Sequence, residues 1–360
     1  MRRRLLFAIA ILSFAHLYIW LRFVHAARLP LPWHVVATTA IVVLAPSLPA
    51  ATLGLRGVPR AKARPLAIVA YTGFGCSVYL LLAAAVTHAL CVITGLDARV
   101  AAIVGVVAAA LTVIYGLVHV ALGPYVKRVR VPLAKLPAGA DGYTIVQLTD
   151  VHIGRVLGGR FAEDVVAKVN ALEPDLIVIT GDLIDGRLEE LRPHVEPLRR
   201  LRARDGVYAV TGNHEYYWNA GPWLEHLRSL GLRMLHNEHV RIADSFELAG
   251  VDDSSATEDV PRAVAGCDPA LPLVLLAHHP RTVARAATAG VDLQLSGHTH
   301  GGQLLPLGWL SRLFDPRVAG LGRFGATWLY VSEGTGFWGP PMRVGTSSEI
   351  THITLLRPSS

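Results

Sequence analysis

The first 126 residues contain four long apolar stretches, and these limit the possible folds more than any other feature of the chain. They cover residues 5–21, 29–55, 65–96 and 100–125, and they contain no acidic residue. A helix of about 20 residues crosses a hydrocarbon core of about 30 Å, so each stretch is long enough, or nearly so, to span a bilayer. Four consecutive stretches of this kind are hard to bury inside a water-soluble protein. We therefore predict a membrane bundle of four helices over residues 1–126.

Charge is divided unevenly between the two parts of the chain. Residues 1–140 carry 14 Lys and Arg but one acidic residue, Asp97, whereas residues 141–360 carry 20 Lys and Arg and 26 Asp and Glu. The net charge of +7 therefore comes from the first part alone. Because the second part is acidic, overall charge excludes a nucleic-acid-binding domain. Cys76, Cys91 and Cys267 have no paired spacing, which argues against a disulfide framework.

The basic residues also predict how the bundle is oriented. The segments before, between and after the four spans carry three, two, four, one and four Lys or Arg in chain order. The larger values fall on the side of the N-terminus and of the second domain, and the positive-inside rule places that side in the cytoplasm. We therefore expect a multi-pass protein of the cell (inner) membrane with a cytoplasmic C-terminal domain. A twin-arginine export signal over residues 2–7 is the alternative, but three further spans argue against a cleaved leader.

Polar residues inside the spans are few. Since the spans contain no acid, a proton or ion pathway is poorly supported. His16, His88 and His119 are expected to form hydrogen bonds within the bundle. Small residues at every fourth position, Ala101, Gly105 and Ala109, favour close helix packing. The bundle is thus expected to act as an anchor.

A different pattern begins after the last span. Residues 127–141 are basic and rich in Pro and Gly, which predicts a linker. Over residues 142–360, short β-rich runs alternate with helical patterns, which predicts one α/β domain with mixed sheets. The expected strands are 143–149, 176–180, 207–211, 246–251, 273–277, 291–295, 327–332 and 349–355, and the expected helices are 160–172, 188–203 and 223–229.

Five of these strands are followed at once by polar residues of the kinds that bind metals. In chain order these residues are Asp150 and His152, Asp182 and Asp185, Asn213 with His214 and Glu215, His278 and His279, and His298 and His300. Ligands of α/β sheets bind beyond the carboxyl ends of the strands, so these residues can meet there. Carboxylates, an amide oxygen and imidazoles without a thiolate suit Mn²⁺, Fe²⁺ or Zn²⁺. Asp182, which follows Gly181, is the best candidate to bridge two cations.

Taken singly, each cluster has an ordinary explanation as a turn, a solvated loop or a packed pair, and the prediction depends on five occurring in order. Three neighbouring features stay open. Asp252 and Asp253 form either a turn or the rim of the site, and Arg155 is either a phosphate contact or a solvated charge. Residues 236–239 lie outside the pattern and are interpreted as a surface loop.

The run DVH, GDLID, GNHE, HH and GHTH resembles the calcineurin-like metallophosphoesterase superfamily over about residues 140–357. With four spans ahead of it, the chain resembles the transmembrane members in particular. Its GHTHGGQ ending is similar to a bacterial branch of membrane-associated phosphodiesterases and nucleotide-sugar-lipid pyrophosphatases. The resemblance implies a four-layer α/β sandwich of the metallo-dependent phosphatase type that binds two divalent metal ions.

The resemblance also implies a role for each site residue. The first metal would be held by Asp150, His152, Asp182 and His300, and the second by Asp182, Asn213, His278 and His298. His214 matches the family's non-ligand histidine beside the scissile phosphate, and Asp185 matches the carboxylate that orients it. Serine/threonine protein phosphatases of the family have Arg directly after that Asp, where this chain has Gly186, which argues against protein-phosphatase activity.

Together these observations predict a membrane-anchored enzyme with two divalent metal ions (Mn, Fe or Zn). It is expected to hydrolyse a phosphodiester or pyrophosphate bond in a lipid or nucleotide-linked lipid, by attack of a metal-bridging hydroxide, with His214 protonating the leaving group. Membrane lipids are expected partners of the basic residues Lys127, Arg128, Arg130 and Lys135, although these charges could equally serve topology alone. Two alternatives are a phosphomonoesterase or phosphodiesterase of soluble substrates, and a non-catalytic metal or phosphate sensor. A serine hydrolase is excluded because the chain has no G-x-S-x-G turn.

Overall fold

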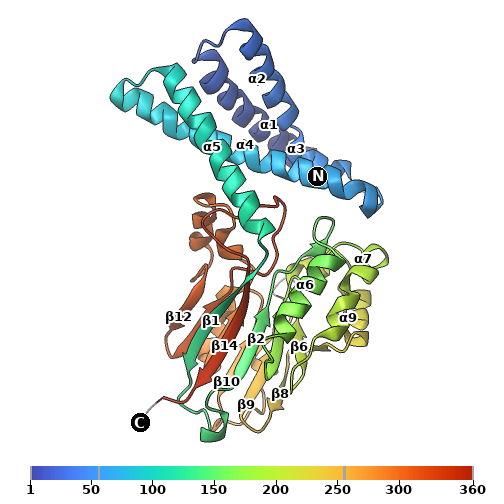
Figure 1. Ribbon diagram of the computed structural model, residues 1–360. Coiled ribbons are helices and arrows are strands. Elements are labelled where there is room, and N and C mark those ends of the chain that lie inside the picture. Colours follow the sequence, from blue (N-terminus) through green and yellow to red (C-terminus); the bar gives the residue numbers. More distant parts are fainter. Residues whose placement is uncertain (1, 56, 254–256, 359–360) are drawn as a thin grey trace. The chain divides into compact units, whose positions relative to one another are not determined.

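The computed structural model describes residues 2–55, 57–253 and 257–358 (Figure 1). Its chain divides into two units. The helical unit runs to Ala121 and includes the later segment Gly339–Val344. The α/β unit comprises Leu122–Trp338 and the residues from Gly345 onward.

Three helical segments among the described residues are long and apolar enough to cross a membrane: Leu31–Gly54, Arg60–Thr94 and Ala98–Ala121. The apolar part of the first helix, Ile9–His25, is shorter. Three of the four predicted spans are therefore supported by length and composition, and the first stays a prediction. The elements of this unit are α1 (Arg2–Trp20), η1 (Leu21–His25), α2 (Leu31–Leu44), α3 (Ser47–Pro49), η2 (Ala50–Gly54), α4 (Arg60–Thr94) and α5 (Ala98–Ala121).

Two histidines of the helical unit form hydrogen bonds between helices, as expected. His16 Nε2 of α1 lies 3.0 Å from Ser77 Oγ of α4, and Tyr18 Oη lies 2.9 Å from His88 Nδ1. His119 stacks on Tyr115, one turn earlier on α5. These contacts give the polar side chains partners inside an apolar bundle, which is their expected structural role.

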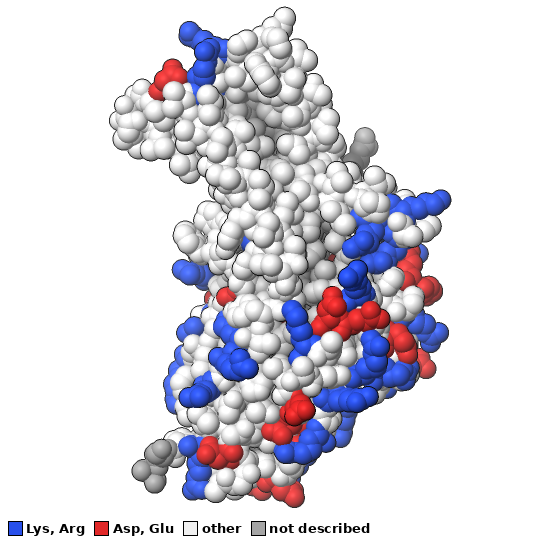
Figure 2. Space-filling view, viewed as in Figure 1, with Lys and Arg blue, Asp and Glu red and all other residues white. Residues whose placement is uncertain are grey.

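The small residues of α5 allow close packing of the helices. Ala101, Gly105 and Ala109 are buried, and a Cβ at Gly105 would lie 2.9 Å from Cε1 of Phe23. Figure 2 shows a broad uncharged surface over the helices, whereas acidic and basic side chains alternate over the α/β unit. Charged side chains are thus concentrated on the α/β unit, which also includes the basic residues Lys127, Arg128, Arg130 and Lys135.

The α/β unit contains two six-stranded mixed sheets. The first sheet has the order β1 (Tyr125–Pro132), β14 (Glu349–Leu356), β2 (Thr144–Leu148), β4 (Leu176–Thr180), β6 (Val207–Val210) and β7 (Arg233–Met234). The second has the order β12 (Gly320–Phe324), β13 (Thr327–Val331), β11 (Leu293–Ser296), β10 (Leu273–Leu276), β9 (Phe246–Gly250) and β8 (Glu238–Ile242). The pairs β14–β2, β12–β13 and β8–β9 are antiparallel, and the other pairs in these sheets are parallel.

Helices cover the outer face of each sheet. Helices α6 (Gly159–Asn170), α7 (Leu188–Val195) and α9 (Ala220–Ser229) pack on the first sheet, as Figure 1 shows beside β2 and β6. Helices α10 (Val260–Ala263) and α11 (Val283–Thr288) pack on the second sheet. A further apolar core joins the two sheets face to face. The expected four-layer sandwich is therefore confirmed.

The strand β4 shows how sequence produces these layers. All five of its residues are buried, as is usual for a central parallel strand covered on both faces. Because side chains alternate along a strand, Leu176 and Val178 enter the core between the sheets, while Ile177 and Ile179 face the helices. A continuous apolar run therefore stabilises two layers at once.

The predicted linker over residues 127–141 is wrong in its first half. Residues of β1 pair in parallel with β14 from Tyr125 to Pro132. The dense positive charge suggested a solvated segment, but charge alternates here with valines at the period of a strand, and Val131 is fully buried. Lys127 Nζ also contacts the buried Glu349 at 2.9 Å.

The helix predicted over residues 188–203 is also interrupted. Helix α7 ends at Val195, and a 3-10 turn, η4 (Glu196–Arg200), follows it. Pro197 lies in the first turn of η4, where a missing N–H is tolerated. Because proline has no N–H to donate, it cannot continue the α-helical hydrogen bonds of α7. The other predicted strands and helices are present within a few residues of their expected ends.

We predict that Phe246→Ala destabilises the α/β unit by about 3–5 kcal/mol, because the ring is fully buried between the sheets. It lies 5.2 Å from the ring of Tyr143, measured between centroids. The midpoint of thermal unfolding of the detergent-solubilised protein should fall by about 10 °C. Phe324→Ala, on an exposed part of β12, is the matched control. Equal shifts for the two variants would contradict this packing.

Candidate metal centre

The seven predicted ligands follow strands of both sheets. Asp150 and His152 follow β2, Asp182 follows β4, and Asn213 begins the short helix α8 (Asn213–Tyr217) after β6. In the second sheet, His278 follows β10, and His298 and His300 follow β11. Parallel strands end at the same edge of a sheet, so residues about 150 positions apart in sequence meet at one place.

The ligand atoms form two compact groups. The first contains Asp150, His152 and His300, and the second contains Asp182, His278 and His298; within each, one ligand atom per residue lies within 4.8 Å of the others. His152 Nε2 is 3.0 Å from His300 Nε2, and His278 Nε2 is 3.3 Å from His298 Nδ1. Imidazole nitrogens that converge in this way are arranged to share a cation.

Asp182 lies between the two groups. Its Oδ2 is 3.3 Å from His278 Nε2 and 3.8 Å from His152 Nε2. Asp182 is therefore the carboxylate that lies between both groups of imidazoles, and its role as a bridge between two cations stays a prediction.

Asn213 supplies a neutral oxygen at the same place. Its Oδ1 is buried and, within the described part of the chain, has no hydrogen-bond partner. A buried carbonyl oxygen without a donor is costly unless a cation or an ordered water satisfies it. This observation, together with the donor set of carboxylates and imidazoles, fits divalent metal ions.

The backbone at the ligands is strained. Five of the seven ligands have φ between +49° and +71°, a region that residues other than glycine seldom adopt: Asp150, His152, Asp182, His298 and His300. Strain of this kind persists where the surrounding structure compensates for it, and it clusters at functional sites.

Two glycines allow the ligand loops to approach one another. A Cβ at Gly212 would overlap Oδ1 of Asp182, and a Cβ at Gly297 would overlap Oδ2 of Asp150. The Gly-Asn-His and Gly-His sequences thus place backbone where any side chain would displace a carboxylate.

The carboxylate of Glu215 holds the loops after β4 and β6 together, a role that the sequence did not predict. Its buried carboxylate accepts hydrogen bonds from the backbone N–H groups of Gly212, Asp182, Leu183 and Ile184, at 2.7–3.2 Å. Burial, and then the charge of Asp182, raise its pKa to about 7. The signal in the sequence was a glutamate at the third position of a helix after Gly212, the spacing of a capping box.

His214 lies beside the ligands but faces a carboxylate. Its Nδ1 is 3.1 Å from Asp185 Oδ1, and the Trp218 indole donates to the same oxygen at 2.9 Å. Its Nε2 is 3.9 Å from Asp182 Oδ2. Burial lowers the pKa of His214, but its hydrogen bond to Asp185 and the nearby carboxylates outweigh burial and raise the pKa above the ordinary value.

Burial and neighbouring charges also shift the pKa values of the predicted ligands. Burial alone would raise the pKa of Asp182, but the imidazoles of His278, His152 and His214 hold it well below its usual range. Burial, followed by the charges of His278 and His279, lowers the pKa of His298 to about 2. Asp182 is therefore a carboxylate and His298 a neutral imidazole, which are the forms that ligate metals.

The sequence left Asp252 and Asp253 open as either a turn or the rim of the site, and the structure places them beside the site. Both are buried, and Asp253 Oδ2 lies 3.1 Å from His279 Nε2, next in sequence to the ligand His278. The interpretation of residues 236–239 as a surface loop is wrong, because Asn237 is buried and donates to Asp252, and the two residues after it begin β8. Arg155 is half-buried after β3 (Ile153–Gly154), and its role as a phosphate contact stays a prediction.

Comparisons with known proteins agree with this geometry. A family model described as calcineurin-like phosphoesterase matches residues 143–302. A transmembrane protein with metallophosphoesterase domain from Danio rerio is 40% identical over 70% of this chain and 62% of its own length. Its counterpart from Bos taurus is 43% identical over 67% of this chain and 59% of its own. The chain thus spans about three fifths of these relatives.

A shorter relative is matched along most of its length. An uncharacterized metallophosphoesterase from Aquifex aeolicus is 34% identical over 64% of this chain and 91% of its own length. Among solved structures, a 5'-nucleotidase precursor from Thermus thermophilus aligns with a TM-score of 0.38 at 15% identity, over 59% of this chain and 54% of its own. The extensive coverage of the Aquifex relative, together with the matched family model, shows that this chain belongs to the calcineurin-like metallophosphoesterases.

Proposed function

We propose that this enzyme hydrolyses a phosphodiester or pyrophosphate bond in an amphipathic, lipid-linked substrate. Two divalent cations, when bound, would neutralise the phosphoryl oxygens and lower the pKa of water, which is a poor nucleophile on its own. The observation that carries the proposal is Asp182 between two groups of imidazoles, in a chain that also contains membrane-anchoring helices.

The ligands divide between the two cations according to their neighbours. Asp150, His152 and His300 would hold one ion together with Asp182. Asp182, Asn213, His278 and His298 would hold the other, with the free Oδ1 of Asn213 as its amide ligand. Thr149 Oγ and the His298 backbone N–H donate to Asp150 and keep its carboxylate aimed at the site.

His214 is the proposed proton donor to the leaving group. Its raised pKa favours the imidazolium, and the bond to Asp185 leaves Nε2 as the nitrogen directed toward the ligand groups. Trp218 fixes Asp185 in turn. Proton donation by a positioned histidine contributes about 10²–10⁴-fold to the rate of such reactions.

The anchoring helices support an amphipathic substrate, since they hold the enzyme at a surface rich in phospholipids. The basic residues contribute less than their number suggests. Lys127 is paired with Glu349, and Lys135 with Asp292 at 3.1 Å, whereas Arg128 and Arg130 are exposed. Contact with anionic headgroups is therefore proposed for the two arginines, and the cytoplasmic position of the α/β unit is proposed from the loop charges.

We predict that His214→Ala lowers kcat for Mn²⁺-dependent hydrolysis of bis-p-nitrophenyl phosphate by about 10²–10⁴-fold without loss of metal, because His214 acts on the leaving group. Turnover and metal content of the full-length protein in detergent are measured together. His226→Ala, a buried histidine of α9, is the control and should retain activity. Loss of one metal ion in His214→Ala would instead make His214 a ligand.

We also predict that the full-length enzyme prefers diesters and diphosphates with a lipid chain over a soluble monoester. Release of phosphate-containing products from a polyprenyl-linked diphosphate is compared with release of p-nitrophenol from p-nitrophenyl phosphate, with Asp182→Asn as the inactive control. The expected preference in kcat/KM is about tenfold or more, the equivalent of at least about 1.4 kcal/mol. A preference for the monoester would favour an enzyme of soluble substrates.

A further inference from the structure

The segment that follows the last metal ligand exposes an unusual number of large apolar side chains. His300 begins the short turn η6 (His300–Gly302), and the 3-10 helix η7 (Leu307–Leu313) comes four residues after it, with no buried residue. The exposed fractions are 42% for Leu307, 54% for Trp309, 59% for Leu310, 75% for Leu313 and 76% for Phe314. Large apolar side chains that are exposed together in one segment of a folded domain indicate an interaction site.

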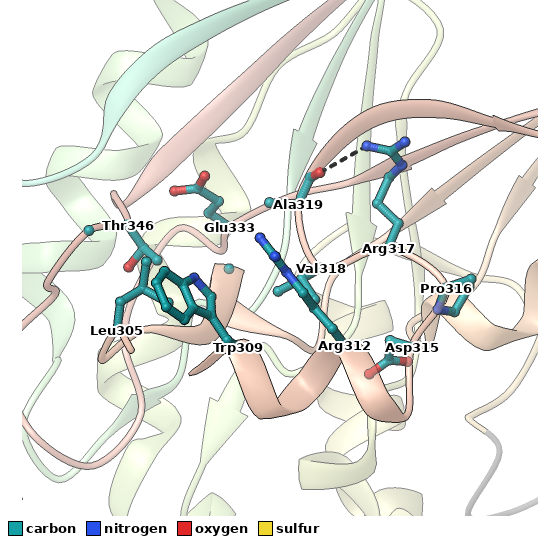
Figure 3. A pocket seen from close by; sticks show the side chains of 12 residues that line it. Leu305, Trp309, Arg312, Asp315, Pro316, Arg317, Val318, Ala319, Glu333 and Thr346 are labelled. Atoms are coloured by element: carbon teal, nitrogen blue, oxygen red, sulfur yellow. Dashed lines mark hydrogen bonds between the residues drawn. The ribbon is translucent and has the colours of Figure 1, made fainter. Parts of the chain in front are cut away.

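A cavity of about 450 Å³ adjoins this surface. Leu305, Trp309 and Glu333 lie on one side of it, and Arg312, Asp315 and Arg317 lie toward the other (Figure 3). Gly301, next to the ligand His300, also lines the cavity, so it borders the loop that carries the metal ligands.

The two arginines share this side of the cavity with the carboxylate of Asp315. The Arg312 guanidinium lies 5.9 Å from the centre of the Trp309 ring, and Figure 3 shows it directed past Val318. Arg317 Nη1 donates to Ala319 O at 3.4 Å, which uses part of its donor capacity. Glu333 accepts a hydrogen bond from Ser347 N and lies 4.0 Å from Lys127, which itself contacts Glu349 at 2.9 Å.

The chemistry of the surface favours a lipid over a protein partner. Segments that lie in the interface of a bilayer commonly combine Leu, Trp and Phe with Arg. Their apolar side chains enter the acyl region, and Arg contacts the phosphates. Guanidinium groups match phosphate geometry. The chain also has helices apolar enough to span a membrane, so phospholipid is an apolar and anionic partner that it meets in its own environment.

We propose that residues 304–317 form an interfacial element that binds membrane phospholipid, with the apolar side chains of η7 and Phe314 on the acyl chains and Arg312 and Arg317 on the phosphate. Binding of this kind would hold a lipid phosphate beside the metal-ligand loop. The catalytic part of this role rests on the proposed function, whereas lipid contact itself does not.

Lipid contact is tested without any need for turnover. Leu313→Cys is made in full-length protein with Cys76, Cys91 and Cys267 replaced by Ser, labelled with a polarity-sensitive fluorophore and reconstituted in anionic phospholipid nanodiscs. Nitroxide lipids should quench this label more strongly than iodide in solution does. A label at the exposed Arg202 is the control and should show the reverse order. The same order at both positions would overturn the proposal, whether or not the enzyme is active.

The catalytic consequence is tested with two esters that differ in chain length. Hexadecyl and ethyl p-nitrophenyl phosphate are hydrolysed by the full-length protein in the same detergent, and the ratio of kcat/KM is measured. Replacing Leu310, Leu313 and Phe314 together by Gln should lower the hexadecyl-to-ethyl ratio by about tenfold or more, because apolar contact with the long chain is lost. An unchanged ratio would show that the segment does not recognise the acyl chain. If kcat/KM falls equally for both esters, the ratio is also unchanged. The segment would then support the metal-ligand loop and would not recognise the acyl chain.

Discussion

The structure of the site depends on one carboxylate that two groups of imidazoles share. Asp182 contacts His278 on one side and His152 on the other, while its second oxygen accepts the backbone N–H of His214. Burying one carboxylate among several imidazole nitrogens is favourable only if positive charge is supplied at the same place. The pKa of His278, which burial alone would lower, is raised to about 10 chiefly by Asp182, and this marks the position where a cation is favoured.

The rest of the α/β unit holds this arrangement in a strained backbone. The strand ends bring ligands from two sheets to one edge, and five of these ligands adopt positive φ values. Glu215 compensates for part of that strain by accepting four backbone N–H groups from two neighbouring loops. Because its partners belong to the loops after both β4 and β6, Glu215 links the shared carboxylate to the helix that carries Asn213 and His214.

The sequence was most informative where one chemical pattern repeats. Buried strands such as residues 176–180 are recognisable because both faces are covered, and the polar residues after them are ligand types in a consistent order. Local sequence patterns did not predict β1. Its Lys and Arg residues suggested a linker, but they alternate with valines in a strand that pairs with residues more than 200 positions later. Local patterns also missed Glu215 and the pairing of Asp253 with His279, because both depend on contacts across loops. The apolar segment after His300 has no periodicity that a short 3-10 helix would reveal, and its exposure is visible once the fold is known.

The central claim is that Asp182 is shared by two metal ions. The most direct test is electron paramagnetic resonance of the Mn²⁺-loaded full-length protein, combined with its metal content. We expect two ions per chain with the spectrum of an exchange-coupled pair, as for ions about 3.5–4 Å apart, and loss of the coupling in Asp182→Asn. A spectrum of isolated Mn²⁺ ions, or a coupled pair that persists in Asp182→Asn, would contradict the account.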